Sequence, residues 1–173
     1  MEYFDVYDAD GRPLNKSVAR GTPLEEGEFF MVIHVWIERA DGKFLIQKRA
    51  KTDDPVPHQW AITSGLASQG ESPRISAVRE VREEIGLSLK PGDLEHRARI
   101  LSEHNRYHTI THVYHTRHAP DIRELSLDEE EVLEVAYVSL DTILDMVSRK
   151  AFWDYDALLG TEDYFSILKE GER

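Results

Sequence analysis

Closely spaced glutamates stand in one short segment of the sequence, where their carboxylates could surround a cation. Glu80, Glu83 and Glu84 follow one another at helical spacing, so on a helix they would converge on one face. Like charges at this spacing repel each other by roughly a few tenths of a kcal/mol. Oxygen-rich clusters suit hard divalent cations, so the spacing favours a Mg²⁺ or Mn²⁺ site.

The residues around these glutamates suit the same chemistry. Arg79 lies one turn before Glu83, where its guanidinium could hold a carboxylate through two parallel hydrogen bonds. Gly65 and Gly70 allow tight backbone geometry in the preceding loop, and a loop carbonyl could supply another oxygen ligand. The alternative is a solvated helix face whose charges pair along the same helix.

The helix that carries the carboxylates is expected from Ser72 to Leu87. Ser72 suits the N-cap and Pro73 the first helical position, while Gly86 can end the helix in a left-handed conformation. Apolar residues at helical spacing predict its buried face: Ile75, Val78, Val81 and Ile85.

Apolar patterning predicts the other elements. A short alternation at residues 3–7, followed by a turn at residues 8–11, predicts a hairpin within residues 1–27. The apolar run 29–37 predicts a central strand covered on both faces. Further strands are expected at 43–49, as the antiparallel partner of 29–37, and at 94–102, 107–118 and 135–138.

The C-terminal region, residues 141–173, is expected to be helical. One helix is predicted from an N-cap at Asp141 to about Lys150, and a second from Tyr155 to Lys169. Strands interleaved with helices predict an α/β or α+β sandwich. The length of 173 residues fits a single domain, 1–173.

Composition limits the partners and the compartment. The net charge of −12 argues against nucleic-acid binding, and an acidic protein that handled phosphates would need metal ions. No apolar run approaches the length of a membrane span, and no secretory signal is visible at the start. The absence of cysteine excludes disulfides and thiolate nucleophiles and agrees with a cytoplasmic location.

The segment from Gly65 to Leu87 reads GLASQGESPRISAVREVREEIGL. The pattern begins with a glycine, followed after five residues by a glutamate and after seven more by Arg-Glu. An aliphatic residue, one residue of any type and Glu-Glu come next, and one further residue of any type precedes the final glycine and aliphatic residue. In this pattern the chain resembles the Nudix hydrolase superfamily, whose signature is the Nudix box. Trp60, the triplet Gln47-Lys48-Arg49 and a later Tyr-Val-Ser-Leu also match, so the resemblance covers roughly residues 29–145.

The resemblance implies an α/β/α sandwich with a mixed central sheet. It also implies hydrolysis of a diphosphate linkage by attack of water on phosphorus, with Mg²⁺ or Mn²⁺ as cofactor and two or more ions. The implied substrate is a nucleoside diphosphate derivative or another small diphosphate. A homodimer is left open, since dimers are common among relatives.

The site residues implied by the resemblance can be assigned position by position. Glu80 and Glu84 would bind the metal directly, and the carbonyl of Gly65 would complete the shell. Glu83 and Glu71 would assist the metal ligands, and Arg79 would be a structural arginine that pairs with other residues of the box.

A carboxylate on a later loop often acts in this family as general base or further ligand. Glu131, just before Val132, is the candidate, and Asp128 and Glu130 are alternatives. Arg49 could contact phosphate or form a surface ion pair, and Trp60 could stack on a base or pack in the core.

The N-terminal part resembles a narrower group, the isopentenyl-diphosphate-isomerase-like branch, through residues 4–8, 34–37 and 47–49. The isomerase uses a cysteine shortly after the tryptophan, with histidine ligands before and after it. Here Ser64 stands near the cysteine position and no histidine precedes His34. Hydrolysis is therefore favoured over isomerisation, and over a non-catalytic diphosphate-binding module, because such modules typically lose helix carboxylates.

The remaining aromatic and histidine residues favour structural roles. In a strand His108 and His112 would lie about 13 Å apart, too far to bind one ion, so hydrogen-bonded or solvated histidines are expected there. His34, within the apolar run, is expected in the core. Core packing is also the favoured role for most of the aromatic residues Tyr107, Phe152 and Trp153.

Overall fold

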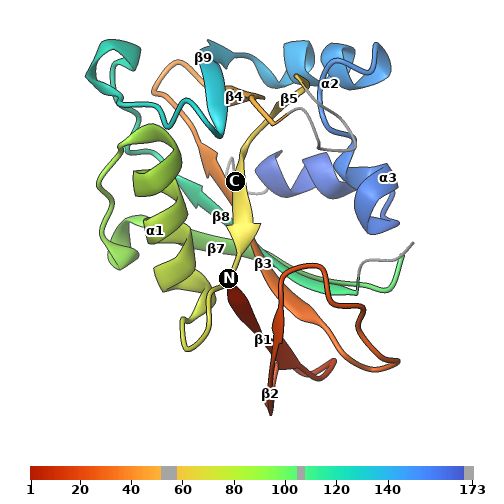
Figure 1. Cartoon of the computed structure of the whole chain (residues 1–173). Helices are drawn as coiled ribbons and strands as arrows, with labels where there is room; N and C mark the ends of the chain where they lie inside the picture. Colours follow the sequence, from red (N-terminus) through yellow and green to blue (C-terminus); the bar gives the residue numbers. More distant parts are fainter. Residues whose placement is uncertain (52–57, 105–107, 170–173) are drawn as a thin grey trace.

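The computed structural model describes residues 1–51, 58–104 and 108–169, in which the strands form three sheets (Figure 1). The largest has the order β6-β3-β8-β7, with β6 at Thr63–Leu66, β3 at Phe30–Ile37, β8 at Thr109–Thr116 and β7 at Glu95–Ser102. β3 and β8 are parallel, whereas β6 and β7 are antiparallel to their neighbours. The predicted mixed sheet is therefore confirmed.

The second sheet is antiparallel, in the order β5-β4-β9, and the third is the N-terminal hairpin of β1 and β2. Their bounds are β5 Trp60–Ala61, β4 Phe44–Arg49, β9 Val132–Val138, β1 Tyr3–Tyr7 and β2 Pro13–Ala19. The helices are α1 Pro73–Ile85, α2 Leu140–Ser148 and α3 Tyr155–Leu159, with 3₁₀ turns η1 Pro91–Asp93, η2 Ile122–Glu124 and η3 Tyr164–Lys169.

Helices cover both faces of the large sheet (Figure 1). On one face α1 packs against the odd-numbered residues of β3, such as Ile33 and Val35. On the other face Trp36 packs among residues of α2, α3 and η3, such as Ile143 and Tyr164. Burial on both faces explains the uninterrupted apolar run that predicted this central strand.

α1 begins and ends as its sequence predicts. The Ser72 hydroxyl accepts the N–H of Ile75 at 3.3 Å, and Gly86 adopts φ +73° after the last turn. The predicted apolar stripe is wrong at Ile75, which is 47% exposed. Six residues turn a helix by about 240°, so Ile75 faces away from Val81, and Ala77 takes the buried position one turn before Val81 instead.

The predicted pairing of the two strands at 29–37 and 43–49 is wrong. Only one isolated bridge, Glu38 to Phe44, joins them at the turn. Both edges of β3 are already occupied by β6 and β8, so β4 diverges into the second sheet, where it pairs with β5 and β9.

The C-terminal helices also differ from the prediction. α2 is capped by Ser139, whose hydroxyl accepts the N–H of Thr142 at 3.1 Å, and not by Asp141. The predicted helix 155–169 is interrupted because Gly160 adopts φ +69° and ends α3, after which η3 follows as a separate 3₁₀ turn. Residues 170–173 and Tyr107 lie outside the described residues.

Candidate active site

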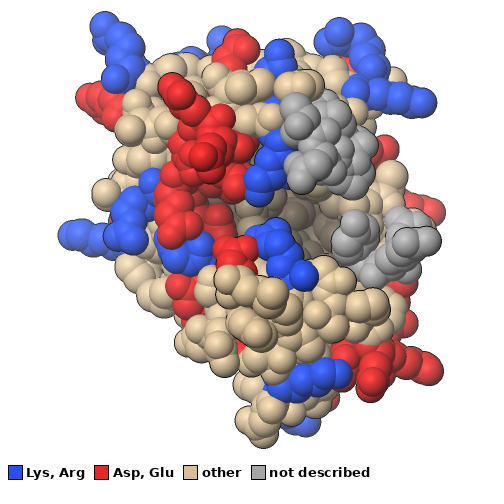
Figure 2. All heavy atoms as spheres, in the orientation of Figure 1, with Lys and Arg blue, Asp and Glu red and all other residues tan. Residues whose placement is uncertain are grey.

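Acidic side chains gather along α1 and the segment beside it, at the edge of a hollow in the surface (Figure 2). Lys and Arg side chains also border this hollow, next to the acidic side chains (Figure 2). The net charge of −12 is thus distributed unevenly, and the hollow combines a negative wall with positive groups. Such an arrangement can hold cations and a phosphorylated substrate together.

Gly65, on β6, lies directly against the side chain of Glu80 on α1. A Cβ atom added at Gly65 would stand 2.5 Å from Cδ and Oε1 of Glu80, which is far inside van der Waals contact. Only glycine therefore allows the strand and the helix carboxylate to approach this closely. The structure brings these two predicted metal ligands together.

Glu84 is the most deeply buried carboxylate of the box, with 9% of its surface exposed. Gln47 on β4 donates a hydrogen bond to its Oε2 at 2.6 Å, and Gln47 in turn accepts one from Thr63 at 2.9 Å. Burial, with a further contribution from the nearby negative charge of Glu80, raises the pKa of Glu84 to about 8. A buried carboxylate held by a neutral amide lacks a full counter-charge, which a cation would supply.

Arg79 organises the remaining carboxylates of the box. Its Nε donates to both oxygens of Glu71 at 3.0 Å, and its Nη1 donates to Glu80 at 2.9 Å and to Glu83 at 3.0 Å. Burial raises the pKa of Glu80, and the charge of Arg79 opposes that shift. Arg79 thus pairs with three carboxylates of the box, and the roles of Arg79 and Glu71 as support for the site stay predictions.

Glu131 lies near enough to the helix carboxylates for its charge to act on them. Its negative charge contributes to raising the pKa of both Glu80 and Glu84, and Lys51 forms an ion pair with it at 2.6 Å. The loop that carries Glu131 is fixed to the end of α1, because the N–H of Asp128 donates to the carbonyl of Glu84 at 3.0 Å.

The neighbouring acidic residue, Asp128, instead shapes the loop. Its Oδ1 accepts the backbone N–H of Glu130 at 3.0 Å, and its carbonyl accepts the N–H of Val132 at 2.7 Å. Asp128, Glu130 and Glu131 are the candidates on this loop for the general base or further metal ligand. The effect of the Glu131 charge on Glu80 and Glu84 favours Glu131.

The family model described as NUDIX domain matches residues 29–158. The chain belongs to the Nudix hydrolase family. It is 31% identical to an uncharacterized Nudix hydrolase of Listeria innocua serovar 6a over 90% of each chain. It is also 28% identical to Nudix hydrolase 3 of Arabidopsis thaliana, over 98% of this chain and 23% of that protein.

The fold is shared with solved Nudix-type structures. A Deinococcus radiodurans crystal structure aligns with a TM-score of 0.74 at 14% identity, covering 99% of this chain and 100% of its own. The MutT protein from Methanosarcina mazei Go1 aligns with a TM-score of 0.66 at 22% identity, covering 90% and 99%. As a Nudix hydrolase, the chain acts on phosphorus-containing anhydrides.

The donor set of the Nudix site fits a divalent cation of the hard class. Carboxylate oxygens and a glycine carbonyl are ligands that Mg²⁺ and Mn²⁺ accept, and a cation would favour the charged form of Glu84, which burial disfavours. Within the described part of the chain, no three His, Cys, Asp or Glu side chains are grouped so that they could hold one ion. Gln47 bonds one oxygen of Glu84, and Arg79 bonds one oxygen each of Glu80 and Glu83, so a cation would bind through the other oxygens, with the carboxylates drawn closer together than they are here.

Arg49 and Trp60, the predicted substrate residues, flank the same region. The guanidinium of Arg49 lies 4.4 Å from the ring centroid of Trp153, and its charge acts on Glu84. Trp60 is half-buried, and its backbone bonds to Ala151 and Trp153 at 2.9 Å each. Their contact with substrate stays a prediction.

Gln47 and Lys51 contact Glu84 and Glu131, and the sequence alone assigned a role to neither of them. In the sequence, Gln47 belongs to the triplet Gln47-Lys48-Arg49 that matches the family, and that match alone gives it no role. Its place at the end of an apolar strand beside the box was the available signal, whereas nothing in the sequence paired Lys51 with Glu131.

Several histidines have hydrogen-bond partners, as expected, whereas the buried Nδ1 of His108 has none among the described residues. His34 is buried and shares a hydrogen bond of 2.7 Å with the hydroxyl of Tyr164. His112 bonds to His96 at 2.9 Å, and His115 bonds to Glu38 at 2.6 Å. Phe152 is a core residue, as predicted. No helix in the described ranges is long and apolar enough to cross a membrane.

Proposed function

We propose that the chain hydrolyses the diphosphate linkage of a nucleoside diphosphate derivative, or of another small diphosphate, with Mg²⁺ or Mn²⁺ as cofactor. The observation that carries the proposal is the buried carboxylate of Glu84, placed beside Glu80 and near Glu131. Burying carboxylates together costs free energy unless cations offset their charge. Because the cluster costs stability, its presence is not explained by a contribution to the stability of the fold.

In this proposal Glu80, Glu84 and the carbonyl of Gly65 hold the metal ions, two or more in number, with Glu83 beside them. When bound, the ions would neutralise phosphate oxygens and lower the pKa of the attacking water. Gln47 orients the Glu84 carboxylate, as residues behind a ligand commonly do.

Glu131 is proposed to accept the proton of the attacking water. The water oxygen forms a bond to phosphorus while the bond between phosphorus and the bridging oxygen breaks, and the leaving phosphate keeps that electron pair. Arg79 holds Glu71, Glu80 and Glu83 in place during this displacement, and contributes no proton, because a guanidinium stays charged throughout the accessible pH range.

The substrate class is supported by the groups around the hollow and by the ligands of similar folds. Arg49 and Lys51 provide positive charge near the carboxylates, and Trp60 and Trp153 provide aromatic surface. The Nudix domain of Shewanella oneidensis NrtR was solved with ADP ribose, and a bifunctional NMN adenylyltransferase/ADP ribose pyrophosphatase of Francisella tularensis, 43% of which is matched, was solved with AMP and a Mn ion. Both ligands are nucleoside phosphates.

The test is an assay of product formation from a panel of diphosphates, with and without Mg²⁺ or Mn²⁺, for wild type and Glu84→Gln. Glutamine keeps the shape and the hydrogen bond to Gln47 but removes the charge. We expect turnover to fall by more than about 100-fold, beyond the effect typical of residues behind ligands, with the fold retained. The matched control is Glu134→Gln, an exposed glutamate on β9, which should keep wild-type turnover.

Two results would contradict the proposal. Near wild-type turnover of Glu84→Gln at saturating Mg²⁺ would exclude a metal-binding role for this carboxylate. Conversion of isopentenyl diphosphate to its isomer, without release of phosphate, would favour the isomerase alternative, which the serine at position 64 disfavours. Action in the cytoplasm and assembly as a homodimer belong to the same proposal and are tested by fractionation and by sedimentation.

A further inference from the structure

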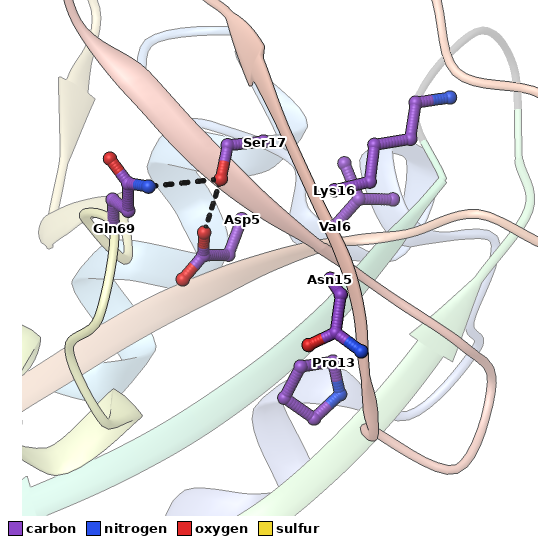
Figure 3. A pocket seen from close by; sticks show the side chains of 7 residues that line it. All are labelled: Asp5, Val6, Pro13, Asn15, Lys16, Ser17 and Gln69. Atoms are coloured by element: carbon purple, nitrogen blue, oxygen red, sulfur yellow. Dashed lines mark hydrogen bonds between the residues drawn. The ribbon is translucent and has the colours of Figure 1, made fainter.

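The N-terminal hairpin is bonded to the loop that leads into α1. Oδ2 of Asp5, on β1, accepts the backbone N–H of Gly70 at 2.8 Å. Oδ1 of the same carboxylate accepts the hydroxyl of Ser17, its partner across the hairpin, at 2.6 Å. Gln69 donates to that hydroxyl at 3.2 Å, and these side chains point toward one another in Figure 3.

The contact lies at the wall of a cavity of about 320 Å³ between the hairpin and the loop. Polar side chains line most of this cavity, so hydrogen bonds rather than apolar packing join the two segments here. Farther along the loop, Ala67 and Tyr7 share a buried apolar cluster. The hairpin therefore contacts the loop at two points, and the contact made by Asp5 is the one nearer to Glu71.

The bonded residue is the turn that sets the direction of Glu71. Gly70 has φ +78°, a left-handed conformation that favours glycine, and the next N–H, of Glu71, donates to the carbonyl of Ser68 at 3.0 Å. Because the Gly70 N–H is taken up by Asp5, this turn cannot rotate without breaking a hydrogen bond to a charged acceptor.

Contacts continue from Glu71 into the carboxylate cluster. Glu71 bonds to Ser76 at 2.6 Å and to Arg79 at 3.0 Å, and Arg79 bonds to Glu80 and Glu83. A change in the turn at residues 68–71 would therefore reach the side chains that are proposed to hold the metal.

We propose that Asp5 is a positioning residue for the Nudix site, acting through the Gly70 N–H and the Glu71–Arg79 pair. The inference rests on the proposed metal-dependent hydrolysis. It extends the functional part of the chain to a hairpin that precedes the matched residues 29–158. Asp5 touches neither the metal nor the substrate in this role.

The experiment compares Asp5→Ala, Asp5→Asn and Asp10→Ala with wild type in the full chain. Three quantities are measured: amide hydrogen exchange at Gly70, the dissociation constant of Mn²⁺ by electron paramagnetic resonance, and kcat. Asp10 is the control because it lies in the same hairpin, is 75% exposed, and faces only Arg12 at 3.6 Å among its ion-pair partners in the described residues.

We expect Asp5→Ala to speed exchange at Gly70 by about tenfold or more and to weaken Mn²⁺ binding by about tenfold, with a matching loss in kcat. Asp5→Asn keeps an oxygen that can accept the Gly70 N–H and should restore most of the Mn²⁺ affinity. Asp10→Ala should match wild type in all three measurements. A merely structural hairpin contact would not change the Mn²⁺ affinity of the folded protein.

Mn²⁺ binding within about twofold of wild type in Asp5→Ala, with the exchange of β1 and β2 amides unchanged, would overturn the inference. If Asp5→Ala unfolds the hairpin, Ser17→Ala decides, since it removes the hydroxyl that bonds Asp5 and Gln69 but keeps the Asp5 carboxylate; unaltered Mn²⁺ binding there overturns the inference as well. If the wild-type chain binds Mn²⁺ but hydrolyses no diphosphate, the proposed function is wrong, and the effect of Asp5 on Mn²⁺ binding can still be measured. Absence of Mn²⁺ binding in wild type defeats both.

Discussion

The two faces of the β6-β3-β8-β7 sheet bury different kinds of polar groups, neutral ones on one face and carboxylates on the other. On the face covered by α2, α3 and η3, one hydroxyl, that of Tyr164, bonds both His34 at 2.7 Å and Trp36 at 3.0 Å. All three groups are neutral and lie in an aromatic core. On the α1 side, Glu80 and Glu84 are charged groups whose burial raises the pKa of each.

The difference separates polar residues that stabilise the fold from polar residues that serve the site. Neutral groups that satisfy one another lower the cost of burial without any ligand. Carboxylates that repel one another and have incomplete counter-charge weaken the fold unless something binds to them. Substitutions on the first face should therefore change stability, and substitutions on the second should change metal binding and turnover.

The largest expected effect on the aromatic face is a loss of stability in acid, caused by His34. Burial lowers the pKa of His34 to about 3, whereas in the unfolded chain it is about 6.5. Below pH 6.5 the unfolded state binds a proton that the folded state does not, so stability falls as the pH falls. Between pH 7.5 and 4.5 this histidine alone should remove about 3 kcal/mol of unfolding free energy.

Urea denaturation at several pH values measures this slope. In His34→Asn the slope below pH 6.5 should become shallower by about one proton. His118→Asn is the control, because His118 is 62% exposed and pairs with Asp93 at the surface. Equal slopes for His34→Asn and wild type would show that His34 takes up its proton in the folded state.

A smaller effect is expected from Tyr164→Phe. The hydroxyl that it removes serves both His34 and Trp36, so two buried groups would lose their partner. The unfolding free energy should fall by about 2 kcal/mol, while turnover of the folded enzyme and its Mn²⁺ affinity stay at wild-type values. A drop in turnover at full folding would place this face in the site and remove the contrast.

The smallest effect is expected from Gln47→Ala, and it should appear in activity. Gln47 holds Glu84 at 2.6 Å, so its loss should lower turnover or Mn²⁺ affinity of the folded protein by about tenfold. Because the buried Thr63 hydroxyl also loses its partner, some loss of stability is expected as well, and both measurements are made on folded protein. Gln59→Ala is the matched control, since the side chain of Gln59 donates to the backbone carbonyl of Lys150, and its own backbone bond to Arg49 is kept in the variant. Loss of stability without loss of activity in Gln47→Ala would make Gln47 a structural residue.

The part of the site that lies within one helix could be predicted from the sequence. The N-cap Ser72, the C-terminal Gly86 and the spacing of Glu80, Glu83 and Glu84 depend on contacts within a few residues, and the structure has them as expected. The mistake at Ile75 has the same local origin. Its apolar side chain predicts burial, but it lies about 120° around the helix axis from Val81 and is exposed.

Contacts between distant segments could not be predicted in this way. β3 and β4 are adjacent in sequence and were expected to pair, yet β6 and β8 occupy the edges of β3. Similarly, the bonds of Gln47 to Glu84 and of Asp5 to Gly70 join residues 37 and 65 positions apart. No periodicity in the sequence encodes which of many polar side chains will meet across such a distance.

By itself, the amino-acid sequence determined the Nudix family, the carboxylate-bearing helix and the class of chemistry, because these depend on residue types at short, regular spacing. The tertiary structure decided which carboxylate is buried, which side chains hold it, and that the N-terminal hairpin bonds to the box. These properties depend on how sheets and helices close around one another, since burial and hydrogen bonding at long range exist only once the chain has packed.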